Sequence, residues 1–164
     1  MTVSVRDLRS EDLEAVHEML TSLHVIRGTM RLPHAPLDLT RKRLEHRSGV
    51  IKLVAEAEGS VVGFGELITY PDLPRHNHAG EVNVIIVRED WQGKGVARTL
   101  MQEMIDLAEN WLGLTRLSLI VWTSNQRAID IYERFGFVVE GTMRNYAFRD
   151  GEYIDAQLMA RINR

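Results

Sequence analysis

Two glycines and two basic residues stand where an apolar strand gives way to a helix, an arrangement that can bind an anion. Gly93 and Gly95 follow a β-branched run, and an amphipathic helix is predicted from Val96 onward. Backbone N–H groups at a helix start point outward and, with the helix dipole, form a site suited to a pyrophosphate. A side chain at either glycine would obstruct that approach, and Lys94 and Arg98 add positive charge. The glycines could equally be no more than a turn before the helix.

Several common catalytic and phosphate-binding motifs do not match this chain. A P-loop requires G-x-x-x-x-G-K-[ST], which is absent, and a dinucleotide-binding loop requires a third glycine where the chain has Arg98. His17 and Glu18 begin a zinc-protease motif, but Thr21 replaces its second histidine, and no G-x-S-x-G occurs. The chain has no cysteine, which excludes disulfides, thiolate metal sites and a cysteine nucleophile. We therefore predict no metal.

The composition indicates a single domain, residues 1–164, with a packed core. Hydrophobic residues make up 45% of the chain, and the net charge of -3 comes from interspersed acids and bases. A binder of nucleic acid or of an anionic membrane needs a basic excess, so neither partner is expected. The sequence contains no run of about 18 apolar residues, so no transmembrane helix is expected. The first residues lack a signal-peptide core, so we expect a cytoplasmic protein.

Hydrophobic periodicity predicts an α/β (α+β) chain of about seven strands and about four helices. A mixed, mostly antiparallel central sheet with helices on both faces suits this order. Glu58, Gly59 and Ser60 separate two β-branched runs and predict a hairpin. The predicted strands include Val3 to Leu8, Ile51 to Glu56, Val61 to Tyr70, Glu81 to Val87, Arg116 to Trp122 and Tyr153 to Met159. The predicted helices are Leu13 to Leu23, Asp38 to Arg47, Val96 to Trp111 and Asn125 to Phe135.

A second motif lies in the predicted helix that follows the strand ending at Trp122. It has the pattern N-x-x-A-x-x-x-Y followed by G-F, given by Asn125, Ala128, Tyr132, Gly136 and Phe137. The glycine loop matches [RQ]-x-x-G-x-[GA] at Gln92, Gly95 and Ala97. With both motifs in this order, the sequence resembles the GNAT superfamily of N-acetyltransferases over nearly its whole length, least between Leu23 and Arg47.

The resemblance implies acetyl-CoA as cosubstrate and assigns residues to it. Ile85, Ile86 and Val87, at the end of a central strand, would pair with the pantetheine arm. Asn125 would hydrogen-bond the coenzyme. The pyrophosphate would be held by the loop and helix start, which consist of Gln92, Gly93, Lys94, Gly95, Val96, Ala97 and Arg98.

The same resemblance places Tyr132 near the thioester sulfur as general acid and suggests Glu81 as general base. The chemistry requires such groups in any case, because a lysine-like amine with a pKa of about 10.4 must lose a proton before it attacks. Without cysteine, direct attack in a ternary complex is favoured. Two alternatives stay open: Tyr132 could be a core aromatic that shares helical spacing with Ile129 and Phe135, and Glu81 could be an ordinary strand-end residue.

The acceptor is expected to be a small molecule with a primary amine. The segments Thr29 to His34 and Glu140 to Arg161 look like a bacterial GNAT group that includes L-amino acid N-acyltransferases, so an L-amino acid is the first choice. Arg31 and His34 could meet its carboxylate, or could be exposed loop residues. The alternatives are a protein N-terminus, a polyamine, an antibiotic or a phosphinothricin-like amine, and a non-catalytic acyl-CoA-binding regulatory module. Similar proteins are frequently homodimers.

Overall fold

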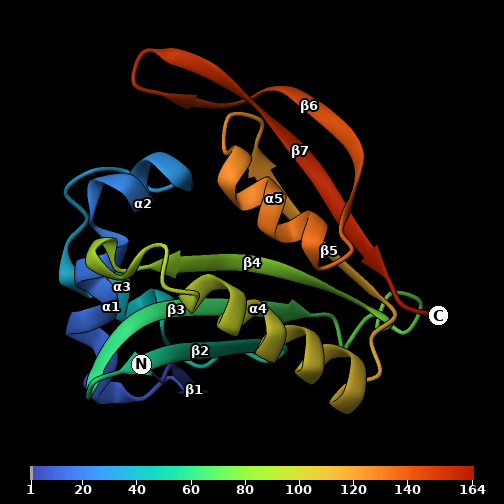
Figure 1. The fold of residues 1–164 in the computed structure, drawn as a ribbon, viewed down its shortest axis with the longest axis horizontal. Helices are drawn as coiled ribbons and strands as arrows, with labels where there is room; N and C mark the ends of the chain where they lie inside the picture. The colour runs from blue at the N-terminus through green and yellow to red at the C-terminus, as the bar shows by residue number, and fades with distance from the viewer. Residues whose placement is uncertain (1) are drawn as a thin grey trace.

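A computed structural model describes residues 2–164 and has a seven-stranded mixed sheet with helices on both faces, as predicted (Figure 1). The strand order across the sheet is β1-β2-β3-β4-β5-β7-β6. The neighbours β4 and β5 run parallel, and the other neighbours run antiparallel. In chain order the elements are β1 (Ser4–Asp7), η1 (Ser10–Asp12), α1 (Leu13–Leu20), α2 (Leu23–Gly28), α3 (Leu37–Arg43), β2 (Val50–Ala57), β3 (Ser60–Thr69), β4 (Ala79–Val87), η2 (Glu89–Trp91), α4 (Val96–Asp106), η3 (Leu107–Trp111), β5 (Arg116–Trp122), α5 (Gln126–Arg134), β6 (Val138–Arg149) and β7 (Glu152–Ile162).

The N-terminal third of the described chain has three α-helices where the sequence predicted two. The predicted helix Leu13 to Leu23 ends early because Thr21 and Ser22 bond back to the preceding turn. The Thr21 hydroxyl donates to the carbonyl of His17 at 2.8 Å, and the Ser22 hydroxyl donates to the carbonyl of Met19 at 2.6 Å. The helix α2 then starts anew at Leu23. Within residues 2–164, no helix is both long and apolar enough to cross a membrane.

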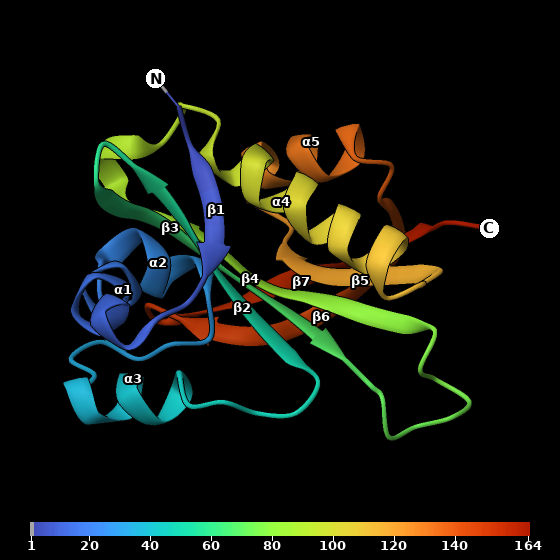
Figure 2. The ribbon, with the colours of Figure 1, turned by 90° about the horizontal axis from the view of Figure 1, so that it is seen from below.

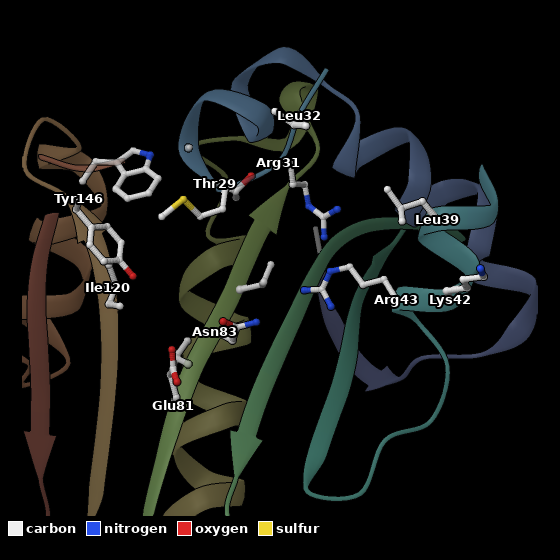
Figure 3. A pocket seen from close by; sticks show the side chains of 15 residues that line it. Thr29, Arg31, Leu32, Leu39, Lys42, Arg43, Glu81, Asn83, Ile120 and Tyr146 are labelled. Atoms are coloured by element: carbon white, nitrogen blue, oxygen red, sulfur yellow. The ribbon is translucent and has the colours of Figure 1, made fainter. Parts of the chain in front are cut away.

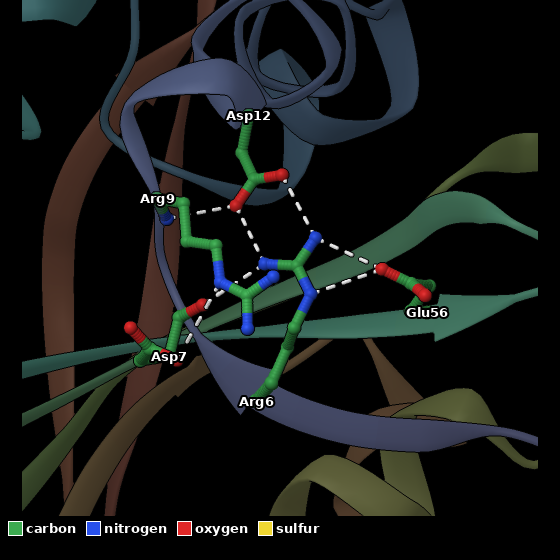
Figure 4. A network of polar contacts seen from close by, with 5 residues as sticks. All are labelled: Arg6, Asp7, Arg9, Asp12 and Glu56. Atoms are coloured by element: carbon green, nitrogen blue, oxygen red, sulfur yellow. Dashed lines mark hydrogen bonds and ion pairs between the residues drawn. The ribbon is translucent and has the colours of Figure 1, made fainter.

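An ion-pair network fixes β1 against β2 and the start of α1 (Figure 4). The Arg6 guanidinium donates to both oxygens of Asp12, at 2.8 and 3.0 Å, and to Glu56 at 2.9 Å. The backbone N–H of Arg9 also donates to Asp12, at 2.8 Å. These hydrogen bonds, chiefly those from Arg6, lower the pKa of the buried Asp12 carboxyl. Asp12 thus satisfies the N–H of Arg9 and the guanidinium of Arg6 at the same time.

The helices form two layers, with α1 to α3 on one face of the sheet and α4 and α5 on the other (Figure 2). Alternate residues of β3 serve the two layers, since Phe64 packs with the residues of α1 while Gly63 lies under α4. A Cβ at Gly63 would stand 2.8 Å from Val96 Cγ1 and 3.0 Å from Leu100 Cδ1. The glycine thus allows α4 to lie directly on the sheet, which fixes the position of its first turn.

The sheet opens between its two parallel strands. β4 and β5 pair only from Ala79 with Arg116 to Glu81 with Ser118, and beyond that point the two strands diverge (Figure 1). A β-bulge lies just past this point: Val82 pairs with Leu67 and Val84 with Glu66, so Asn83 is the extra residue. A bulge bends and twists its strand. The result is a wedge-shaped gap whose walls are the last residues of β4 and β5.

Candidate active site

Three cavities that share walls follow the gap between β4 and β5. The wedge cavity, about 770 Å³, lies between α2, α3 and the beginnings of the diverging strands. The loop cavity, about 500 Å³, lies at the end of β4 and the start of α4. The junction cavity, about 160 Å³, shares Val82, Asn83 and Trp122 with the first and Ile85, Ala97 and Asn125 with the second. Gly28 and Thr29 line all three. Together they form one path across the molecule.

The loop cavity brings together most of the residues predicted to bind a cofactor. Those that line it are Ile85, Ile86, Val87, Gln92, Gly93, Gly95, Val96, Ala97, Arg98 and Asn125. Lys94 does not line it; its ammonium lies over the Trp91 ring, 4.8 Å from the centroid. Arg127 lines the cavity and was not singled out from the sequence, although it stands two residues after Asn125 in the second motif.

Gly95 has a backbone that few residues other than glycine adopt. It caps the start of α4 with φ of 84°, in the left-handed region. A Cβ at this position would meet no protein atom within 4 Å. A side chain there would therefore project into open space where the N–H groups of the α4 start are free to bind an anion. This geometry fits a pyrophosphate and gives Gly95 a role beyond that of a turn residue.

Tyr132 lines the junction cavity, between the other two cavities. It packs on the hydrophobic core, and its ring lies 6.2 Å from that of Phe137. Burial raises the pKa of Tyr132 to about 12. Its hydroxyl is consequently neutral at physiological pH and retains a proton that it can donate. Core packing and a position on the cavity wall thus coexist in this residue.

Glu81 lies at the narrow end of the wedge cavity, on the last residue of β4 that pairs with β5. The hydroxyl of Tyr70 donates to Glu81 Oε2 at 3.1 Å. Burial and the negative charge of Glu81 raise the pKa of Tyr70, so this donor stays protonated. The arrangement holds the Glu81 side chain at the cavity wall, where a carboxylate can accept a proton from a bound amine.

Arg31 and Arg43 both line the wedge cavity, and Figure 3 shows their guanidinium groups pointing into it. Burial, and secondarily the positive charge of Arg43, lowers the pKa of Arg31 to about 10. His34, predicted to act with Arg31, is exposed and does not line the cavity. Its backbone φ of 63° belongs to a turn at the surface. The cavity also includes Asn83 and Trp122, which no motif in the sequence indicated, and Tyr146, which belongs to the segment Glu140 to Arg161 but was given no role.

The helix α2 bridges the two sides of the gap. On the β4 side, His24 Nε2 donates to the carbonyl of Val87 at 2.9 Å. On the other side, the carbonyl of Arg27 accepts from Trp122 Nε1 at 3.0 Å and from Arg149 at 2.8 Å. The Arg27 guanidinium pairs with Asp150, in the turn between β6 and β7, at 2.8 Å. The end of α2 therefore lies across the gap and lines all three cavities.

Whether the described residues could bind a metal ion depends on how their donor side chains are arranged. Within residues 2–164, no group of three or more His, Asp and Glu side chains is arranged to hold a metal ion. The groups that the cavities do present are N–H donors, carboxylate, phenol and guanidinium. These suffice for proton transfer and for binding anions.

Comparison with known proteins identifies the family. The model of the acetyltransferase (GNAT) family matches residues 13–137, from α1 through α5. This chain belongs to the GNAT family. It is an N-acetyltransferase that depends on acetyl-CoA, with both GNAT motifs on the walls of the loop and junction cavities.

Three similar proteins span nearly the whole GNAT chain. The L-amino acid N-acetyltransferase AaaT of Escherichia coli is 38% identical over 160 residues, covering 98% of each chain. The spermidine N(1)-acetyltransferase of Escherichia coli is 32% identical over 94% of this chain and 83% of its own length. The spermidine N-acetyltransferase of Vibrio cholerae, solved in complex with CoA and spermine, is 28% identical. It has a TM-score of 0.86 and covers 98% of this chain and 95% of its own.

The environment of Tyr132 predicts its titration. Its folded pKa of about 12 lies above the ordinary value of 10.0, so the unfolded chain releases this proton first as pH rises. The raised pKa therefore lowers the free energy of unfolding as the pH rises from 10 to 12. In Tyr132→Phe, this contribution to the pH dependence should be absent. We expect an ultraviolet difference titration, wild type minus Tyr132→Phe, to show one phenol with a midpoint near 12. A midpoint at the ordinary value would contradict the burial of this hydroxyl.

Proposed function

We propose that this GNAT enzyme transfers the acetyl group of acetyl-CoA to the α-amino group of an L-amino acid, by direct attack in a ternary complex. The observation that carries the acceptor class is the half-buried Arg31 guanidinium on the wall of the wedge cavity. Arginine recognises carboxylates bidentately, and a free amino acid offers one beside its amine. The similarity to the L-amino acid N-acetyltransferase AaaT supports the same class.

The loop cavity would hold the coenzyme. The start of α4 offers N–H groups and Arg98 to the pyrophosphate, and Arg127, whose guanidinium lies beside Gly93 of the loop, adds a second cation. The edge of β4 that faces β5 has no strand partner beyond Glu81, so its backbone groups, apart from the Val87 carbonyl that accepts from His24, are available to pair with a pantetheine arm. When bound, acetyl-CoA supplies the thioester whose carbonyl carbon the amine attacks.

The side chains of the other two cavities would move the protons. Glu81, held by Tyr70, would take a proton from the ammonium of the acceptor, directly or through water. Tyr132 would hold a proton at its hydroxyl and give it to the departing sulfur. The N–H groups of β4 beside the bulge would stabilise negative charge on the carbonyl oxygen. The proposed base therefore lies on β4 and the proposed acid on α5, on either side of the gap.

The wall of the wedge cavity also favours an amino acid over a polyamine. Arg31, Lys42 and Arg43 contribute three cations to it, against the carboxylate of Glu81 and that of the buried Glu66, which pairs with Arg43, so a net positive charge is left. A polycationic acceptor would be repelled, as like charges are in a partly desolvated site. Apolar groups for an acceptor side chain are present as well, namely Met30, Ile120, Trp122 and Tyr146.

A cytoplasmic location and a homodimeric assembly belong to the same proposal. The relatives named above are bacterial acetyltransferases that span this chain almost end to end, which supports a protein of the same kind. Sedimentation of the full chain would test the dimer, and cell fractionation would test the location.

Gly95→Glu tests the coenzyme site. The added side chain places bulk and negative charge in the loop cavity, against the pyrophosphate. We expect calorimetry to show acetyl-CoA binding weakened at least about hundredfold, the loss of two charge-assisted hydrogen bonds. Gly113→Glu is the matched control, since Gly113 also has a left-handed backbone, with φ of 67°, and open space around it. Equal binding by the two variants would exclude the assignment.

Tyr132→Phe tests the proton donor. The change removes one hydroxyl and almost no volume, so the fold and the affinity for acetyl-CoA should stay as in the wild type. We expect kcat to fall about hundredfold, the low end for general acid–base catalysis. The control is Tyr153→Phe, which removes the hydroxyl of an exposed tyrosine on β7. Unchanged kcat, under conditions where chemistry limits the rate, would rule out the role.

An acceptor panel tests the proposed substrate. We expect kcat/KM for L-methionine and other free L-amino acids to exceed that for L-methioninamide, spermidine and short peptides. Arg31→Gln should lower kcat/KM for the free acid about tenfold to hundredfold and leave the amide unaffected, because a charge-assisted hydrogen bond is lost. Arg41→Gln, at an exposed arginine on α3 that does not line the cavity, is the control. A clear preference for amides, polyamines or peptides would overturn the acceptor class.

A further inference from the structure

We propose that Glu66 determines which amino acids this enzyme accepts: by neutralising Arg43 in the wall of the wedge cavity, it restricts acceptors to those with a single carboxylate. The inference rests on the proposed function, since it concerns the same acceptor site. Glu66 does not itself line the cavity and acts through two residues that do, Arg43 and Asn83. It is a positioning residue for the acceptor.

Glu66 is a buried carboxylate with an extensive set of partners. It lies on β3 with 1% of its surface exposed, where an unpaired ionised carboxylate would be very costly. Arg43 donates to its two oxygens, at 2.8 Å and 3.4 Å, from α3. Asn83, the extra residue of the β4 bulge, donates to Oε1 at 2.7 Å. One side chain thus ties together three elements that surround the wedge cavity.

The contacts of Glu66 decide how much positive charge the deep part of the cavity offers. Two of the nitrogens of Arg43 are directed at Glu66, so its charge is matched within the wall. Arg31 lies close enough that Arg43 lowers its pKa and Glu66 acts against that effect. Among residues 2–164, the structure gives the Arg31 guanidinium no ion-pair partner. Lys42 stands exposed at the rim. The deep wall therefore presents one cation, Arg31, to a ligand.

An acceptor with a second carboxylate meets an unfavourable environment here. Its α-carboxylate would occupy Arg31, and the second one would have to bind Arg43, whose guanidinium already donates to Glu66. Two carboxylates competing for one guanidinium repel each other in a partly desolvated wall. An acceptor with a neutral side chain brings no second negative charge, and that side chain can pack against Ile120 and Tyr146.

The wild-type enzyme provides the first measurement. L-glutamate and L-glutamine have nearly the same shape and differ in the charge of the side chain. We expect kcat/KM for L-glutamate to be at least about tenfold lower than that for L-glutamine, which corresponds to the loss of a single charged contact. Equal values in the wild type would overturn the proposal without any variant.

Glu66→Gln provides the second measurement. The amide keeps an oxygen for Asn83 but removes the charge, so Arg43, whose side chain is 24% exposed, can turn to a ligand in the cavity. We expect the ratio of kcat/KM for L-glutamate over L-glutamine to rise about tenfold or more. A loss confined to folding or packing would lower both rates together and leave the ratio unchanged, which would contradict the proposal.

The double variant Glu66→Gln with Arg43→Gln provides the control. It removes both charges, so the cavity wall is again neutral at this point and no guanidinium is released. We expect the ratio to return to the wild-type value. A ratio that stays high in the double variant would overturn the proposal. Absence of turnover with every free amino acid would instead refute the proposed function itself, a different result from turnover with an unchanged ratio.

Discussion

The site depends on the short pairing between β4 and β5. The two strands run parallel and stay paired over three residues each, from Ala79 with Arg116 to Glu81 with Ser118. The paired residues are the first three of each strand, so the strands separate toward their carboxyl ends and the backbone edges exposed there face each other across one gap. Beyond Glu81 and Ser118 there are no hydrogen bonds between β4 and β5, so the edge of β4 becomes available to a ligand. All three cavities follow from this separation.

Other contacts hold the gap at a fixed width. The helix α2 reaches from Val87 on one arm to Trp122 and the turn after β6 on the other, using backbone carbonyls as acceptors on both sides. Below it, Glu66 links α3 to the bulge at Asn83. An open sheet edge would otherwise be free to close or to pair with another strand. The polar contacts therefore keep the cleft open and set its charge at the same time.

The glycine loop, the helix that follows and the second motif could be predicted from the sequence because they are local. Gly95 needs a left-handed backbone and a following helix, and both signals stand within a few residues of it. Tyr132 sits at a fixed spacing from Asn125 within one helix. The number of strands and the mixed sheet could also be predicted from hydrophobic periodicity and the order of elements along the chain, but the order of the strands across the sheet could not. The break between α1 and α2 was missed as well, since it depends on hydroxyl groups that bond back to the helix.

The sequence by itself determined the family and predicted the residues of the glycine loop, because those depend on spacing along the chain. The tertiary structure alone decided which residues line the wedge cavity. Arg31 lines the cavity and His34, three residues later, does not, since the turn between them points the histidine to the surface. Arg43, Glu66 and Asn83 come from three separate elements and meet only because α3 packs over the bulged strand. Contacts between distant residues depend on packing and strand register, which no local pattern encodes.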